Sequence, residues 1–250
     1  MKNNFFNLPL ENVNSKPSNN SEVLSQILYG EKFRILKKKG NWIKIKTNFD
    51  NYIGYIKNKK FIRNFKPKLK IFRLKSKIFV KKKNKFLPTK KYLYFATGIP
   101  ILKKNKTYIE FEKNKWLKKS DTKKIDHIER NYTKIIKLFL NSKYLWGGKT
   151  ADGIDCSALI QIYFYYNRIF FPRDSIDQKK FCRGKKHKKL KKGDIIFWKG
   201  HVGLCVNTKK FIHAYGPRKK VLIMPINYTI NQILKTANLK IKKVSNIINY

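Results

Sequence analysis

An internal repeat constrains the fold of this chain more than any other feature of its sequence. The segment ILKKKGNWIKIK, which begins at Ile35, aligns without gaps with ILKKNKTYIEFE, which begins at Ile101. The alignment pairs Trp42 with Tyr108, so an aromatic residue stands at the same place in both segments. Because a repeated segment indicates a repeated supersecondary unit, we expect two copies of one small module.

The first copy has the pattern of half-buried strands. Ile43 and Ile45 alternate with lysines, and glycine and asparagine residues separate the short apolar runs. A period of two places alternate side chains on opposite faces of a strand. We therefore expect a small β-barrel or sandwich over residues 1–66 and a second, divergent copy over residues 67–122.

The pattern changes to a helical one after residue 126. Apolar residues recur there at spacings of three and four, which predicts an amphipathic helix. These residues are Ile128, Tyr132, Ile135, Ile136, Phe139 and Leu140. A second helix is predicted from Cys156, and short strands are predicted in DIIFW, HVGLCV and FIHAYG. Helices followed by an antiparallel sheet make an α+β domain, which we place at residues 123–250.

The start of the second predicted helix carries a cysteine. Asp155 is a suitable N-cap, so Cys156 lies in the first turn of this helix. The partial positive charge of a helix N-terminus favours a thiolate over a thiol and lowers the pKa of a cysteine. Since the thiolate is the reactive form, we expect Cys156 to be a nucleophile.

Two histidines of the predicted sheet can supply the base. His201 begins one strand and shares a face with Gly203, which leaves room beside the imidazole. His213 lies in the next strand and shares a face with Phe211 and Tyr215. Neighbouring antiparallel strands can therefore place the two imidazoles side by side. In that arrangement His213 fixes the tautomer of His201, as the third member of a catalytic triad does.

These segments together resemble a known family. YLWGGKTADGIDCSALIQ, PRDSIDQ, GDIIFW, HVGLCV and FIHAYG follow one another in the order typical of NlpC-type cell-wall cysteine peptidases, which have a papain-like fold. SQILYGEKFRIL and DNYIGYI resemble bacterial SH3-like (SH3b) domains. The resemblance implies an α+β papain-like catalytic domain preceded by two small all-β SH3-like barrels. This order is typical of γ-D-glutamyl-L-diamino acid endopeptidases, which act on released murein peptides.

The resemblance also implies roles for single residues. Cys156 matches the nucleophile, His201 the base and His213 the third polar member of the family's catalytic set. The residues that match its substrate site are Tyr144, Asp155, Ser157, Asp174 and Ser175. Ala158 stands where the family commonly has glycine. The chemistry implied needs no metal and no cofactor.

The resemblance implies a short peptide as the substrate. The thiolate attacks the γ-D-glutamyl carbonyl, and the imidazolium of His201 protonates the leaving amine of the diamino acid. Asp174 is expected to pair with the free ammonium of an N-terminal L-Ala in a small murein peptide. Tyr52 or Tyr55 of the first β-module would close that end of the groove.

The charge of the chain invites a different interpretation. Its formal net charge is +46, which is typical of proteins that bind nucleic acid. The lysines, however, are spread over every segment, together with many Asn, Ile, Phe and Tyr residues, whose codons are AT-rich. We therefore interpret the charge as mostly a solvated surface and consider a nucleic-acid partner unlikely.

The remaining features concern the compartment. No run reaches the roughly 18 apolar residues of a spanning helix, and the N-terminus lacks the apolar core of a secretory signal. Cys156, Cys182 and Cys205 form neither a disulfide framework nor a metal site of the CxxC type. We expect a cytoplasmic protein without a membrane partner that recycles wall peptides. The alternatives are a wall-remodelling hydrolase, an amidase or acyltransferase on the same fold, and a non-catalytic SH3b protein that binds the wall or a polyanion.

Overall fold

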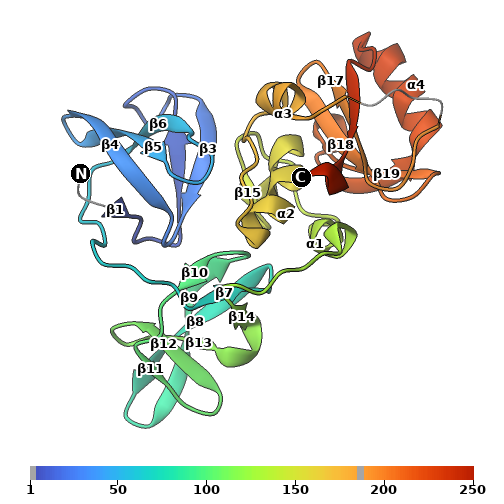
Figure 1. The fold of residues 1–250 in the computed structure, drawn as a ribbon. Coiled ribbons are helices and arrows are strands. Elements are labelled where there is room, and N and C mark those ends of the chain that lie inside the picture. The colour runs from blue at the N-terminus through green and yellow to red at the C-terminus, as the bar shows by residue number, and fades with distance from the viewer. Residues whose placement is uncertain (1–3, 185–188) are drawn as a thin grey trace. The chain divides into compact units, whose positions relative to one another are not determined.

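The computed structural model describes residues 4–184 and 189–250 (Figure 1). The chain divides between Ile128 and Glu129 into two compact units. The first unit is built of strands, and the second combines helices with an antiparallel sheet. We describe each unit by itself.

The first β-module forms a sheet of six strands in the order β1-β4-β5-β6-β2-β3. Its strands are β1 (Asn4–Phe5), β2 (Leu10–Asn14), β3 (Val23–Leu28), β4 (Lys32–Lys39), β5 (Trp42–Thr47) and β6 (Ile53–Lys57). The predicted alternation is confirmed in β5, where Ile43 and Ile45 are fully buried. The two isoleucines join one core cluster with Phe33 and Ile56. Lys44 between them and Lys46 after them are half-buried, so the lysines lie on the face of β5 that is turned away from this core.

The second β-module has a sheet of five strands in the order β11-β12-β13-β8-β9 and a smaller one in the order β10-β7-β14. Its strands are β7 (Leu69–Ile71), β8 (Lys75–Lys82), β9 (Lys85–Tyr94), β10 (Gly98–Ile99), β11 (Lys103–Lys104), β12 (Tyr108–Glu112), β13 (Lys115–Lys118) and β14 (Thr122–Lys124).

The repeat extends to the register of strand pairing. In the first module Lys38 pairs with Ile43, and in the second Lys104 pairs with Ile109, which are the aligned positions. Ile43 and Ile109 are both buried. The same sequence pattern therefore builds the same hairpin twice.

The two β-modules share a core. Tyr29 of the first module belongs to one cluster with Ile71 and Leu93 of the second. Its ring meets that of Phe111 edge to face, with the centroids 5.4 Å apart. At the end of this unit β14 pairs with β7, so residues 122–124 belong to the β-unit and not to the segment after it.

The second unit is an antiparallel five-stranded sheet with helices. Its sheet has the order β20-β19-β18-β17-β21, and β15 and β16 form a separate hairpin. The strands are β15 (Lys149–Thr150), β16 (Gly153–Ile154), β17 (Asp194–Trp198), β18 (His201–Cys205), β19 (Lys210–Tyr215), β20 (Lys220–Pro225) and β21 (Lys243–Asn246). The helices are α1 (Tyr132–Leu138), α2 (Cys156–Asn167), α3 (Ser175–Phe181) and α4 (Ile226–Ala237). Helix α2 packs against β18 and β19, and α4 packs against β19 and β20.

The first predicted helix is shorter than its apolar pattern. Asn131 caps α1, because its side chain accepts a hydrogen bond from the backbone of Lys134, and this fixes the start of the helix after Ile128. Leu140 lies beyond the last turn. Ile128 and Leu140 are 60% and 40% exposed, so the prediction that both belong to the apolar face of this helix is wrong.

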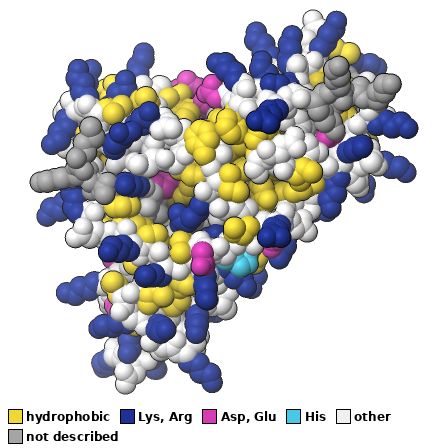
Figure 2. Space-filling view, viewed as in Figure 1, with side chains coloured by type: hydrophobic (Ala, Val, Ile, Leu, Met, Phe, Trp, Pro, Cys, Tyr) yellow, Lys and Arg dark blue, Asp and Glu magenta, His cyan; other side chains and the backbone are white. Residues whose placement is uncertain are grey.

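Charge is spread over the surface. Figure 2 shows Lys and Arg side chains at many separate places on the face in view and not gathered in one patch. Within residues 4–184 and 189–250, no helix is both long enough and apolar enough to cross a membrane.

Candidate active site

Cys156 is the first residue of α2, as predicted. The side chain of Asp155 caps the helix, since its Oδ1 accepts a hydrogen bond from the backbone N–H of Ala158 at 2.8 Å. The β15–β16 hairpin leads directly into this cap. A Cβ at Gly148 would lie 2.4 Å from the carbonyl oxygen of Gly153, so this close approach requires glycine. The tight hairpin therefore positions the start of α2.

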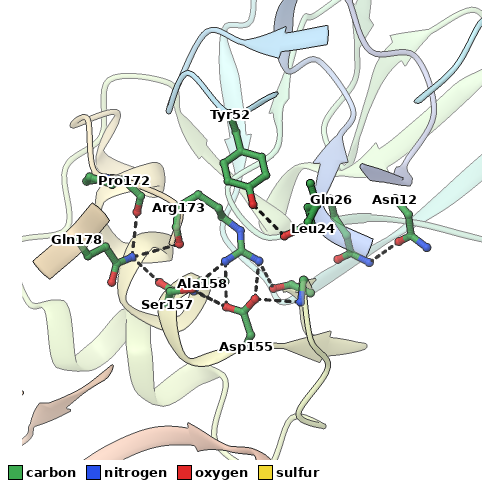
Figure 3. Close-up of polar contacts among 12 residues, drawn as sticks. Asn12, Leu24, Gln26, Tyr52, Asp155, Ser157, Ala158, Pro172, Arg173 and Gln178 are labelled. Carbon is green, nitrogen blue, oxygen red and sulfur yellow. Dashed lines mark hydrogen bonds and ion pairs between the residues drawn. The ribbon is translucent and has the colours of Figure 1, made fainter. Parts of the chain in front are cut away.

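Asp155 does more than cap the helix (Figure 3). Its carboxylate forms a bidentate ion pair with Arg173, with Nη2 to Oδ2 at 2.6 Å and Nη1 to Oδ1 at 3.0 Å. Both side chains are buried. Ser157 donates to Asp155 at 3.0 Å and accepts from Arg173 at 2.9 Å. Asp155 and Ser157 thus belong to a buried network beside Cys156, and sequence reasoning did not single out Arg173.

Gln178 ties α3 to the same network. Its fully buried side chain donates to the carbonyl oxygens of Ser157 and Pro172, each at 2.9 Å. The PRDSIDQ segment therefore packs on the first turn of α2. Arg173 and Gln178 both belong to the PRDSIDQ motif, which predicted part of the substrate site but not the hydrogen bonds that these two side chains form.

The two predicted histidines meet across neighbouring strands. Nε2 of His201 on β18 lies 2.9 Å from Nδ1 of His213 on β19. His213 is fully buried, and its ring stacks on that of Tyr215 with the centroids 4.7 Å apart. The prediction that the two imidazoles lie side by side is confirmed.

Gly203 leaves space for the side chains of β19. The sequence predicted that this space lies beside the imidazole of His201. The register of β18 and β19 places Gly203 opposite His213. A Cβ at Gly203 would lie 2.3 Å from the ring of Phe211 and 2.9 Å from the Cβ of His213. The missing side chain therefore accommodates Phe211 and His213.

The thiol of Cys156 lies beside β18. Its sulfur accepts hydrogen bonds from the backbone of Val202, the residue after His201, and of Ser157. Burial raises the pKa of the thiol to about 12, and the negative charge of Asp155 adds to this effect. The Val202 and Ser157 hydrogen bonds and the charge of Arg173 act in the opposite direction. The predicted lowering of the pKa of Cys156 is therefore wrong for the resting site, because burial outweighs the field of the helix N-terminus.

Burial also affects the histidines. It lowers the pKa of His201 to about 4. It lowers the pKa of His213 to about 3, with a further contribution from the charge of His201. Near neutral pH the resting site consequently holds a neutral thiol and two neutral imidazoles.

The other candidate residues lie at different places in the same unit. Tyr144 is joined to Ile154 by a parallel bridge, and its pKa is raised by burial and then by the charges of Cys156 and Asp155. Its phenol therefore lies close to the thiol. Asp174 and Ser175 are half-buried at the start of α3, directly after Arg173.

Tyr52 and Tyr55 belong to the β-unit. Tyr55 lies in β6, whereas Tyr52 precedes this strand, and its hydroxyl donates to the carbonyl oxygen of Leu24 at 3.5 Å. Only Tyr55 of the two candidates therefore lies within a strand. Their place in a substrate groove stays a prediction.

Comparisons with known proteins agree with this architecture. The sequence model of the NlpC/P60 family matches residues 141–238, and that of the bacterial dipeptidyl-peptidase Sh3 domain matches residues 14–61. A solved structure of an NlpC/P60 family protein from Bacillus cereus ATCC 10987 covers 98% of this chain and 99% of its own length. It has a TM-score of 0.81 at 20% identity, which shows a common fold.

Two curated relatives match most of the chain. The γ-D-glutamyl-L-lysine dipeptidyl-peptidase of Bacillus subtilis strain 168 is 26% identical in an alignment of 234 positions, gaps included, and the match covers 83% of this chain and 77% of the relative. The protein of the same name from Bacillus cereus is 25% identical in an alignment of 249 positions, and the match covers 84% of this chain and 72% of the relative. A probable endopeptidase NlpC homolog of Haemophilus influenzae is 36% identical over 81 residues, 30% of this chain and 43% of that protein.

Proposed function

Because this chain belongs to the NlpC/P60 family of cysteine peptidases through its residues 141–238, we propose that it hydrolyses the bond between γ-D-glutamate and a diamino acid in short murein peptides. Cys156 is the nucleophile of this proposal, His201 the base and His213 the residue that orients His201. The observation that carries it is the 2.9 Å contact between the two imidazoles next to a cysteine at a helix start.

The chemistry begins from a neutral site. His201 accepts the thiol proton on Nδ1 while the sulfur of Cys156 attacks the γ-carbonyl carbon. The backbone N–H of Cys156, at the start of α2, is suited to donate to the oxyanion. The imidazolium then returns the proton to the leaving amine as the C–N bond breaks. A water molecule, deprotonated by His201, cleaves the thioester and restores the thiol.

The substrate class of the proposal is supported by the two Bacillus relatives, which are named for γ-D-glutamyl-L-lysine and match this chain over most of their length. Tyr144, beside the thiol, is suited to contact the peptide. Asp155 and Ser157 act through the buried network with Arg173, which holds the start of α2. Asp174 and Ser175 are proposed to bind the free ammonium of an N-terminal L-Ala.

Mass spectrometry of products tests the reaction. Purified protein incubated with L-Ala-γ-D-Glu-L-Lys should release L-Ala-γ-D-Glu and lysine, and Cys156→Ala should release neither. Hydrolysis by the Cys156→Ala variant would contradict the role of the thiol. Products of amide hydrolysis elsewhere in the peptide, or of acyl transfer, would favour the other chemistries of the same fold.

Blocking the amino group of the tripeptide tests whether Asp174 and Ser175 bind its ammonium. N-acetylation of the tripeptide should lower kcat/KM at least tenfold, since a carboxylate without its cation loses on the order of 1 to 3 kcal/mol. Asp174→Asn should reduce this discrimination, because it lowers kcat/KM for the peptide with a free amino group. Asp177→Asn changes an exposed acid of α3 and should leave the discrimination unchanged. Equal cleavage of both peptides would favour remodelling of the intact wall over recycling.

A further inference from the structure

A cavity of about 340 Å³ opens beside His201, within the unit that carries the cysteine. One wall is the turn between β17 and β18, with Lys199, and another is α4, with Gln232 and Thr236. Tyr144 and Tyr215 also line it.

Helix α4 lies over the face of the sheet that carries the histidines. Ile226 and Ile233 of this helix share a core cluster with Phe211 and Tyr215 of β19, the two neighbours of His213 on its face. Gln232 and Thr236 are one turn apart on α4, and the hydroxyl of Thr236 donates to the backbone carbonyl oxygen of Gln232. The packing of α4 therefore fixes the wall that carries Gln232 and Thr236.

The chemistry of the proposed function determines which part of a peptide this cavity faces. The group that protonates the leaving amine must lie within hydrogen-bond reach of it. Since His201 has that role and lines the cavity, the residue on the amine side of the broken bond lies next to this space.

The polar atoms that line the cavity indicate which groups a ligand needs. Oε1 of Gln232 is buried and has no hydrogen-bond partner among the described residues. A buried acceptor without a donor is unfavourable, so a ligand N–H at this place is stabilising. Lys199 provides a cation, and none of the described lining residues has a carboxylate. The cavity thus suits a ligand with an ammonium and a carboxylate separated by a methylene chain, which Ile233 and Leu239 can cover.

We propose that this cavity binds the diamino acid released by the reaction, with its distal ammonium on Oε1 of Gln232 and a carboxylate at Lys199. The inference rests on the proposed function, because it takes the diamino acid as the leaving group. Gln232 and Lys199 then determine which residue follows γ-D-glutamate.

A substrate series tests the assignment. The tripeptides L-Ala-γ-D-Glu-X, where X is L-lysine, meso-diaminopimelate or L-norleucine, differ in the distal end of X. We expect kcat/KM for the lysine and diaminopimelate peptides to exceed that of the norleucine peptide at least tenfold. Gln232→Leu should bring the ratio of lysine to norleucine close to one, and Gln232→Glu, which keeps an acceptor, should preserve or raise it. Asn231→Leu, an exposed neighbour on α4 outside the cavity, should keep the ratio of the unmodified protein.

The role of Lys199 has its own comparison. Lys199→Gln should lower kcat/KM for the lysine peptide with a free carboxylate and bring it close to that of the same peptide with a carboxamide. Free lysine should inhibit the unmodified protein competitively and inhibit Gln232→Leu at least tenfold more weakly. Thermal unfolding of each variant checks that the fold is kept.

The two proposals fail in different ways. If the unmodified protein cleaves none of the three peptides, the proposed function is wrong and the assignment of the cavity falls with it. If it cleaves the lysine and norleucine peptides with equal kcat/KM, or if Gln232→Leu lowers both equally, the proposed function stands and the assignment is overturned.

Discussion

Nε2 of His201 lies 2.9 Å from Nδ1 of His213, and this contact decides which nitrogen of His201 can act as a base. If His201 donates through Nε2, its Nδ1 is free to accept a proton, and the neutral His213 carries its own proton on Nε2. That nitrogen is buried and has no partner among the described residues. The catalytic tautomer therefore leaves one buried N–H unpaired, a cost on the order of 1 to 3 kcal/mol.

This arrangement predicts the effect of changes at His213. His213→Asn should retain more activity than His213→Ala, because the asparagine carbonyl oxygen can accept the proton of His201, whereas alanine has no acceptor in its side chain. His201→Ala should lose more than either, since the base itself moves the proton. Values of kcat and KM on the tripeptide measure the order, and the change should lie in kcat. Equal activities for the asparagine and alanine variants would show that orientation of His201 does not depend on this acceptor.

Gly203 offers a test of the geometry without removing a polar group. Gly203→Ala places a methyl group 2.3 Å from the ring of Phe211 and 2.9 Å from the Cβ of His213, so β19 must shift. Overpacking of this kind costs about 1 to 3 kcal/mol. We expect lower thermal stability and lower kcat.

Gly184→Ala is a suitable control, because its nearest contact is the flexible end of Lys243 at 3.4 Å. Full activity of Gly203→Ala would contradict the need for close packing at the histidine pair.

The histidines also predict how stability depends on pH. In the unfolded chain each histidine binds a proton near its ordinary pKa of 6.5, whereas in the folded chain the pKa of His201 is about 4 and that of His213 about 3. Between these values the unfolded state holds more protons, so the free energy of unfolding falls as the pH decreases from about 6.5 towards 4. The slope approaches about 1.4 kcal/mol per pH unit for each histidine.

Urea unfolding at a series of pH values measures this slope. The variant His213→Asn should have a shallower dependence, because one of the two histidines with a lowered pKa is gone. A flat profile between pH 4 and 6.5 for the unmodified protein would show that the folded state does not lower the pKa of the histidines.

The sequence predicted those features that depend on local patterns. The alternation around Ile43 predicted a strand, the Asp155-Cys156 pair predicted a capped helix start, and the positions of His201 and His213 on adjacent strands predicted their contact. Each follows from residues near one another in the chain or from the period of a strand.

Features that depend on burial could not be predicted in this way. The pKa of Cys156 is set by the protein around it, so the helix start alone gave the wrong direction. The partner of Asp155 is Arg173, and no periodicity links the two. Helix α4 was missed, although Ile226, Ile230 and Ile233 have helical spacing, and with it the wall that carries Gln232 was missed.

The ion pair between Asp155 and Arg173 leads to the largest expected change in stability. Both side chains are almost fully buried, and the carboxylate also accepts from the backbone N–H of Gly147 and Ala158. Arg173→Ala removes the cation and leaves a buried carboxylate, which costs about 3 to 5 kcal/mol. Lys180→Ala is the control, since its pair with Asp177 is exposed and contributes at most about 1 kcal/mol.

A double-mutant cycle separates the pair from its surroundings. Asp155→Ala and Arg173→Ala combined should cost less than the sum of the single changes, because the double variant buries no unpaired charge. Urea unfolding gives the four free energies. Additive losses would show that the two side chains do not interact, and an effect of Arg173→Ala as small as that of Lys180→Ala would show that the pair is exposed to solvent. If the cycle gives the expected coupling, the start of α2, and with it the position of the Cys156 thiol, depends on a residue seventeen positions after it in the chain (173 minus 156).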